Sequence, residues 1–325
     1  MSKNSKTTLR KSKILFFGGE IGGIGKSITA RVAVEQTIAA KQEFYLIDAD
    51  ASTPNVGLTY EKAMYEGFMT GEKLASDDLP PTLGLVDRKK SPVLHDQITF
   101  TGDAKSYLAA DKILLMGNVK DVIVVLPSQV SVYVHRWFDQ NDIAGMLEDP
   151  EHNIELCYFF VTNGTPESIA LFVESVERYE GKIPHVLVKN LGAATNIDWK
   201  WFDRDKQAAT VLEKYKFKSI EFPELIILPE IKTEIISKNI PFGDAMKSDW
   251  MPFPSKRRIK TWFKEATQAM ASTDYVPAHP DYPLLGLQPP SDTKTSDING
   301  DEGEQNTPPP SENPPQWMIH LRRNS

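Results

Sequence analysis

The chain has 325 residues, of which 25% are charged and 40% are hydrophobic; 37 lysines and arginines against 44 acidic residues give a net charge of −7. These values are typical of a globular protein, and the acidic balance argues against a surface uniformly coated in positive charge for holding DNA. The single cysteine, Cys157, excludes an internal disulfide and an all-cysteine metal cluster. We expect it to be a small buried hydrophobe in a strand.

No apolar run approaches the roughly 18 residues of a membrane-spanning helix, and no signal-peptide stretch precedes the first apolar run. The sequence therefore predicts a cytoplasmic protein without a transmembrane segment.

Short apolar runs alternate with longer amphipathic stretches along most of the chain. The apolar runs predict buried strands at Ile14–Phe17, Phe44–Ile47, Val122–Leu126, Leu156–Val161, His185–Val188 and Leu225–Leu228. Helical stretches lie between them at Ser27–Lys41, Pro166–Glu180 and Trp199–Lys214. This alternation predicts an α/β protein with a doubly wound, mostly parallel sheet, in which ligands bind at the carboxyl ends of the strands.

Composition divides the chain into three parts. Residues 1–12 form a basic arm, residues 13–275 a folded domain with an irregular insertion at about 60–103, and residues 276–325 a tail rich in proline and acidic residues. We expect the tail to be disordered because it buries too little apolar surface. Its final segment, Gln316–Ser325, is either a docking peptide for a partner protein or an apolar terminus without a partner.

The strongest motif is Phe16-Phe-Gly-Gly-Glu-Ile-Gly-Gly-Ile-Gly-Lys-Ser-Ile28, which follows an apolar run and opens a helical stretch. Glycines at 22, 23 and 25 allow backbone N–H groups to turn toward one anion, and the start of the helix favours negative charge at the same place. Lys26 has the position to reach phosphates, and the Ser27 hydroxyl the position to bind Mg²⁺. The motif predicts a phosphate-binding loop.

The segment Ile21–Ser27 resembles the phosphate loop of the ParA/MinD group of P-loop ATPases, which reads Lys-Gly-Gly-x-Gly-Lys-Thr/Ser. Two further stretches, Tyr45–Asp50 and Leu228–Pro241, are similar to the group's second strand end and late Pro-Glu segment, and the resemblance spans about residues 13–270. It implies P-loop ATPase chemistry with ATP and Mg²⁺, in which Asp48 and Ser27 bind the metal and Asp50 and Lys26 are catalytic. The nucleotide-binding residues that it implies are Gly22, Gly23, Ile24, Gly25, Lys26, Ser27, Ile28, Asn190, Pro229 and Glu230, with Asn190 and the Pro-Glu segment at the adenine.

The residues alone leave another interpretation of Asp48 and Asp50, because two carboxylates at a strand end are also found as solvated loop charges or helix caps. Within the group, the chain looks closest to the plasmid mobilisation and stability branch (MobD/StbB-like). Gly18-Gly-Glu20, Tyr60, Val125–Ser131 and Arg136-Trp-Phe138 carry that finer resemblance.

Three positions depart from the group's pattern. Ile21 replaces the lysine that crosses the dimer interface, Glu20 replaces a glycine of the loop, and Leu126 replaces an aspartate that helps to hold Mg²⁺. Asp121 lies at the start of its strand, at the wrong edge to substitute for that aspartate. Each lost charged contact costs about 10²–10³ in rate. We therefore expect ATP binding with weak or absent hydrolysis.

A late stretch, Ser255–Glu265, is both amphipathic and basic. Ile259, Trp262, Phe263 and Ala266 share one helical face. A second face carries Lys256, Arg257, Lys260 and Lys264, which either contact DNA phosphates nonspecifically or form a solvated surface.

Three functions remain open. The first is a nucleotide-controlled homodimeric switch in plasmid partition, stability or mobilisation, with DNA or a plasmid or relaxosome protein as partner. The second is a nucleotide-binding interaction module whose catalytic site is inactive. The third is an ATP-dependent small-molecule ligase of the dethiobiotin-synthetase or cobyrinate-amidase kind.

Overall fold

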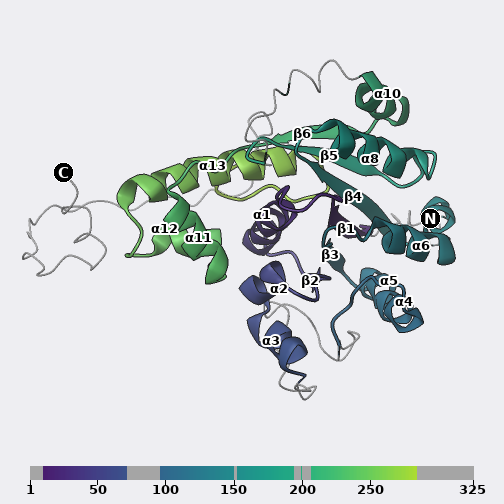
Figure 1. Cartoon of the computed structure of the whole chain (residues 1–325), viewed down its shortest axis with the longest axis horizontal. Helices are drawn as coiled ribbons and strands as arrows, with labels where there is room; N and C mark the ends of the chain where they lie inside the picture. The colour runs from purple at the N-terminus through teal and green to yellow at the C-terminus, as the bar shows by residue number, and fades with distance from the viewer. Residues whose placement is uncertain (1–9, 72–95, 150–151, 194–198, 200–205, 284–325) are drawn as a thin grey trace, which may run out of the picture. The chain divides into compact units, whose positions relative to one another are not determined.

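A computed structural model describes residues 10–71, 96–149, 152–193, 199 and 206–283. Its described residues contain a parallel sheet of six strands in the order β2-β3-β1-β4-β5-β6 (Figure 1). Because β1 lies between β3 and β4, the chain adds strands on both sides of its first strand. The predicted α/β, doubly wound parallel sheet is confirmed.

The central strands are buried on both sides. The strands are β1 (Ser12–Gly18), β2 (Phe44–Asp48), β3 (Asp121–Val125), β4 (Ile154–Thr162), β5 (His185–Asn190) and β6 (Lys218–Phe222). In β1, Ile14 and Phe16 pack into one apolar cluster, whereas Leu15 and Phe17 pack into the other. A strand with both faces covered needs apolar residues at consecutive positions, which explains the continuous apolar runs.

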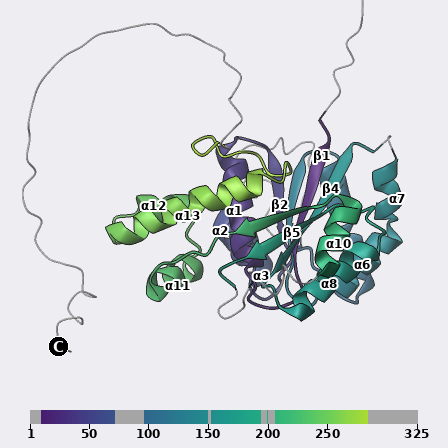
Figure 2. The same ribbon diagram turned by 90° about the horizontal axis from the view of Figure 1, so that it is seen from above.

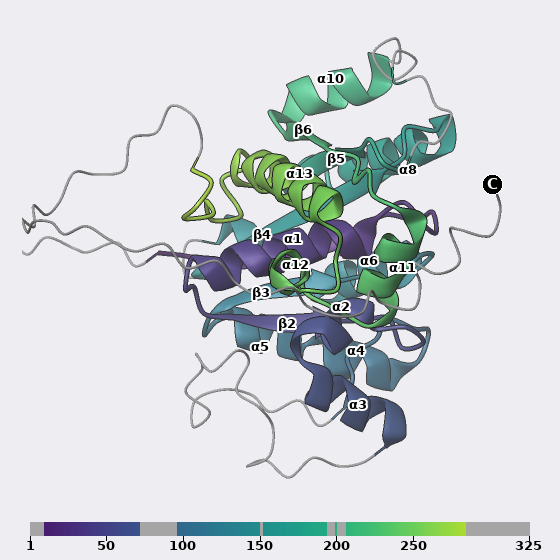
Figure 3. The ribbon, with the colours of Figure 1, turned by 90° about the vertical axis from the view of Figure 1, so that its left-hand side faces the viewer.

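Helices cover both faces of the sheet (Figures 2 and 3). On one face lie α1 (Lys26–Ala39), α11 (Pro229–Ser237), α12 (Phe242–Lys247) and α13 (Phe253–Ala271). On the other lie α4 (Ala104–Ala110), α5 (Lys112–Gly117), α6 (Ser131–Gln140), α7 (Ile143–Glu148), α8 (Pro166–Glu177) and α10 (Lys206–Tyr215). Two short helices, α2 (Asn55–Tyr60) and α3 (Lys62–Thr70), lie next to β2.

The prediction of a strand at Leu225–Leu228 is wrong. This segment is a loop that leads into α11, with Ile226 and Leu228 largely exposed, and the sixth strand is Lys218–Phe222. Only Ile220 and Phe222 of β6 are buried, because it is an edge strand with α13 packed on one face. A search for continuous apolar runs therefore selects the loop and misses the half-buried strand.

The predicted helices agree with the structure except at their ends. The first begins at Lys26 and the second ends at Glu177. The third is described from Lys206, and residues 200–205 of its predicted span lie outside the described residues. Among the described helices, none combines the length and apolar character that crossing a membrane requires.

All described residues belong to one unit, which spans 1–285. Most of the predicted arm, part of the predicted insertion, and the predicted tail from residue 284 onward lie outside the described residues. The described chain continues past α13 to Pro283, and Val276 is buried in the apolar cluster beneath α1 and α13.

Candidate functional site

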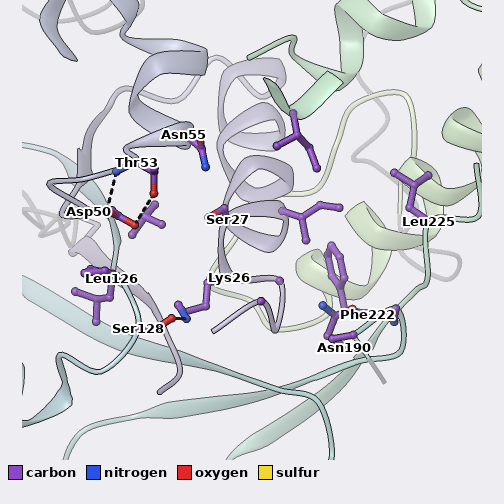
Figure 4. Close-up of a pocket in the computed structure, with 18 of the residues that line it drawn as sticks. Lys26, Ser27, Asp50, Thr53, Asn55, Leu126, Ser128, Asn190, Phe222 and Leu225 are labelled. Carbon is purple, nitrogen blue, oxygen red and sulfur yellow. Dashed lines mark hydrogen bonds between the residues drawn. The ribbon is translucent and has the colours of Figure 1, made fainter. Parts of the chain in front are cut away.

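The glycine-rich motif connects β1 directly to α1, at the carboxyl edge of the sheet. Gly25 precedes α1 with a φ of 96°, and Gly23 has a φ of 74° with open space where a side chain would begin. Both conformations favour glycine. The loop borders a cleft of about 370 Å³, whose lining also includes residues from the ends of β2, β3, β5 and β6 (Figure 4).

Lys26 points back over its own loop. Its Nζ donates hydrogen bonds to the Ile21 carbonyl at 3.1 Å and to Oγ of Ser128 at 2.9 Å (Figure 4). The side chain is 7% exposed, and burial lowers the pKa of Lys26 to about 8, although the carboxylates of Glu20 and Asp50 oppose that change. Both of its partners are neutral oxygens, so an entering phosphate would offer this amine stronger hydrogen bonds.

Asp50 lies on the opposite wall of the cleft, after β2. Its carboxylate accepts hydrogen bonds from the backbone and hydroxyl of Ser52 and from the backbone and hydroxyl of Thr53, at 2.7–3.2 Å. Burial opposes ionisation, yet these bonds hold the pKa of Asp50 below its usual value. The carboxylate is thus charged. It is also a weak base, because its oxygens already accept these hydrogen bonds, so it is poorly suited to take a proton from water.

Asp48 ends β2 and is 2% exposed. Its carboxylate accepts backbone hydrogen bonds from Asp50 at 3.2 Å, Val56 at 2.9 Å and Gly57 at 3.0 Å. Burial raises the pKa of Asp48 to about 7, although these bonds favour the charged form. Both expected functions of Asp48 are therefore compatible with its position: it braces the start of α2, and it lines the cleft.

The residues of the predicted metal site suit Mg²⁺. Ser27 and Asp48 both line the cleft and offer hard oxygen ligands, which Mg²⁺ combines with phosphate oxygens and water. No cluster of three or more histidine, cysteine or acidic side chains suited to a metal occurs among the described residues. Mg²⁺ would therefore depend on the bound phosphates for most of its other ligands.

Two of the three departures from the group's pattern are accommodated locally. Glu20 turns toward α6, where its carboxylate accepts a hydrogen bond from the backbone of Ser131 at 3.2 Å. Ile21 packs against the apolar cluster on the α1 face. Leu126 is buried beside the cleft, and Asp121 lies at the amino edge of the sheet, where its carboxylate binds Arg10. The expected wrong-edge position of Asp121 is confirmed.

Six of the ten predicted nucleotide-binding residues line the cleft, and Gly22, Ile24, Pro229 and Glu230 do not. Gly23, Gly25, Lys26, Ser27, Ile28 and Asn190 line it. Pro229 and Glu230 begin α11, and this helix faces the cleft with Lys232 and Ile236 instead. Ile24 is buried at 2% exposure, with its side chain in the core beneath the loop.

Sequence reasoning missed several residues of the site. Ser128 holds Lys26, and Gln97 donates from Nε2 to the carbonyls of Asp48 at 2.9 Å and Asp50 at 2.8 Å. Thr53 and Asn55 line the wall next to Asp50 (Figure 4). The polar run after Asp50 was a local signal for Thr53 and Asn55, but no local pattern marks Gln97, which lies 47 residues away.

The expected amphipathic helix is α13. Ile259, Trp262, Phe263 and Ala266 are buried against the sheet. Lys260, Lys264 and Arg257 are exposed, and Lys256 is half-buried. The basic face is therefore accessible.

Cys157 and three residues of the finer resemblance lie among the described residues. Cys157 is completely buried in β4 and, as expected, is a core residue. Trp137 and Phe138 of the finer resemblance are also core residues, and Tyr60 donates a hydrogen bond to Glu35 at 2.7 Å.

The chain matches no family model and no curated protein. Solved structures do match. The MinD cell division protein of Aquifex aeolicus is 17% identical, with 80% of this chain and 97% of that chain covered and a TM-score of 0.39. A plasmid partition protein of Borrelia burgdorferi bound to AMPPNP is 16% identical, with coverages of 81% and 99% and a TM-score of 0.43. The MinD ATPase of Pyrococcus furiosus is 17% identical, with coverages of 78% and 98% and a TM-score of 0.41.

These matches are to the ParA/MinD-type ATPases that the sequence resembles, and they do not distinguish the mobilisation and stability branch. This chain has in its own right the strand order of a doubly wound sheet and a glycine-rich loop between β1 and α1.

Proposed function

We propose that this protein is a cytoplasmic ATP- and Mg²⁺-binding switch of ParA/MinD type, acting in plasmid partition, stability or mobilisation. Two copies would close over bound nucleotide, and the closed dimer would bind DNA or a plasmid protein. Backbone N–H groups of the loop would hold the phosphates, Lys26 would neutralise them, and Ser27 and Asp48 would bind Mg²⁺. Asp50 would orient water for slow hydrolysis.

One observation carries the proposal. The lysine of the glycine-rich loop and the two aspartates at the carboxyl end of β2 border the same cleft, although the loop follows β1 and β3 lies between these two strands. The cleft lies where a doubly wound sheet binds ligands, at the carboxyl ends of its strands. A solvated loop or a simple helix cap would not require a buried amine facing such a cleft.

The first test is ATP binding with Mg²⁺ by isothermal titration calorimetry. Lys26→Ala removes the charge beside the phosphates and should weaken ATP binding by about 100-fold or more. Lys105→Ala, on an exposed position of α4 at the opposite face of the sheet, is the matched control and should bind like the wild type. Equal affinity of Lys26→Ala and wild type would contradict the proposed site.

A second candidate, a nucleotide-binding module without hydrolysis, is favoured by the surroundings of Asp50. Four hydrogen bonds already occupy its carboxylate, and a leucine stands at position 126. A carboxylate held in this way is poorly suited to orient a water molecule. In this version, ATP binding and release would themselves change the state of the protein.

Turnover separates the two versions. If the site is inactive, ATP hydrolysis by the wild type should equal that of Lys26→Ala, and Asp50→Ala should change nothing. If the switch hydrolyses ATP, the wild type should exceed that background, and Asp50→Ala should lower the rate by about 10²-fold. Steady-state phosphate release under saturating ATP and Mg²⁺ measures both.

A further inference from the structure

The amide side chain of Asn190 is engaged at both ends by the protein itself. This residue ends β5 and is 4% exposed. Its Nδ2 donates to the Ile24 carbonyl of the phosphate loop at 2.7 Å, and its Oδ1 accepts the backbone N–H of Gly192 at 3.1 Å. A side chain that was expected to contact adenine is therefore bonded to the loop that faces the phosphates.

Gly25 and Asn190 fit closely against one another. A β-carbon placed on Gly25 would lie 2.0 Å from Nδ2 of Asn190, so the residue must be glycine for steric reasons as well as for its φ of 96°. The Gly25 carbonyl is also fixed, because it accepts hydrogen bonds from the backbone and the hydroxyl of Thr29. The loop is thus held on both sides of Gly25.

Fixing one carbonyl also fixes the next N–H. Because a trans peptide unit is planar, its carbonyl and its N–H point in opposite directions. When Ile24 directs its carbonyl to Asn190, the N–H of Gly25 must point away from Asn190. Backbone N–H groups of such loops are the donors that hold phosphate, so their direction in the ligand-free protein determines how much reorganisation binding requires.

We infer that Asn190 is a positioning residue, which holds the Ile24–Gly25 peptide of the phosphate loop in its phosphate-binding orientation and does not select the base. This inference rests on the proposed nucleotide site. Asn190 would then contribute to binding of the phosphate chain. The affinity of any ligand with that chain should depend on Asn190, whether or not the ligand carries a base.

The test compares ATP with inorganic tripolyphosphate, which has the phosphate chain and no base. In calorimetry with Mg²⁺, Asn190→Ala should weaken both ligands by the same factor, about tenfold, because a buried carbonyl loses its donor. A loss for ATP with unchanged tripolyphosphate binding would assign Asn190 to the base and overturn the inference. Unchanged binding of both would overturn it as well.

A second measurement does not depend on any ligand. Hydrogen exchange of the ligand-free protein should be faster at the amides of residues 22–27 in Asn190→Ala than in the wild type, since the loop has lost a fixed point. Unchanged exchange there would contradict the positioning role. If wild-type protein binds neither ATP nor tripolyphosphate, the proposed function fails, whereas the exchange result still decides whether Asn190 fixes the loop.

The matched control is Thr162→Val at the end of the neighbouring strand β4. Thr162 is completely buried and accepts the backbone N–H of Gly164 at 3.0 Å, so this substitution also removes a strand-end hydrogen bond. It should leave the ligand affinities and the loop exchange at wild-type values. Unfolding midpoints of both variants establish that the comparison is made on folded protein.

Discussion

The amine of Lys26 shows how the ligand-free site is arranged at the scale of one residue. A positive charge that is nearly buried would be costly without partners, and here the Ile21 carbonyl and Ser128 hydroxyl receive its hydrogen bonds. Burial still lowers the pKa of this amine to about 8. Binding a phosphate replaces two neutral acceptors with charged oxygens, and this favours the protonated amine.

The lowered pKa of Lys26 predicts the pH dependence of ATP binding. Above about pH 8 the ligand-free amine loses its proton, and phosphate binding must restore it, so affinity should fall by up to about tenfold per pH unit. The measurement is the dissociation constant of Mg²⁺–ATP between pH 7 and 10. Lys26→Arg keeps its charge over this range and should show a flat profile; an equally steep fall in that variant would assign the effect to another group.

At the scale of secondary-structure elements, a buried polar network joins α1 to α2 and α12. Glu35 of α1 accepts hydrogen bonds from the Phe242 backbone at 2.6 Å, the Gly243 backbone at 2.8 Å and the Tyr60 hydroxyl at 2.7 Å. Arg31, one turn earlier, donates to the Ile240 carbonyl and lies over the Phe242 ring. The helix that begins at the phosphate loop is therefore attached through polar contacts to α12 and to Ile240 in the loop before it.

Removing Glu35 should destabilise the protein more than removing its tyrosine partner. Glu35→Ala leaves two backbone N–H groups at the start of α12 without their acceptor and should lower the free energy of unfolding by about 2–4 kcal/mol. Tyr60→Phe removes one hydrogen bond and should cost about 1 kcal/mol. Urea denaturation of both variants measures the difference, and equal losses would show that the α12 contacts carry little of the stability.

The sequence predicted the elements whose signals are local. Three features are marked by residues that are close together in the sequence. They are the glycine-rich loop before a helix, the strands that are buried on both faces, and the buried face of α13. The contacts that define the site are not local: Asn190 reaches Ile24 across 166 residues, and Glu20 reaches Ser131 across 111. Which donor meets which acceptor at that separation depends on the strand order, and the sequence pattern does not specify it.

At the scale of the whole molecule, one exposed basic surface contrasts with the acidic net charge. The net charge is −7, yet the exposed side of α13 carries Arg257, Lys260 and Lys264. A cluster of this kind attracts phosphates even on an acidic protein, because screening limits repulsion from charges more than about 10 Å away. DNA binding by this face is thus compatible with the overall composition.

Charge reversal on α13 tests that interaction. Lys260→Glu with Lys264→Glu should weaken nonspecific duplex DNA binding by at least tenfold and reduce its salt dependence, while ATP affinity stays at the wild-type value. Fluorescence anisotropy at several salt concentrations, with ATP present, is the measurement. If the pair is merely solvated, DNA binding will be the same in both proteins.

The position of β3 between β1 and β2 gives this strand the role of a spacer. It separates the loop that carries Lys26 from the turn that carries Asp50 by two interstrand distances, or about 10 Å. Val124 pairs with Phe16 on one side and with Ile47 on the other. A change in the spacing or register of β3 relative to its neighbours would therefore alter the distance between Lys26 and Asp50. The ligand would have to span a different distance, although neither of these residues had been changed.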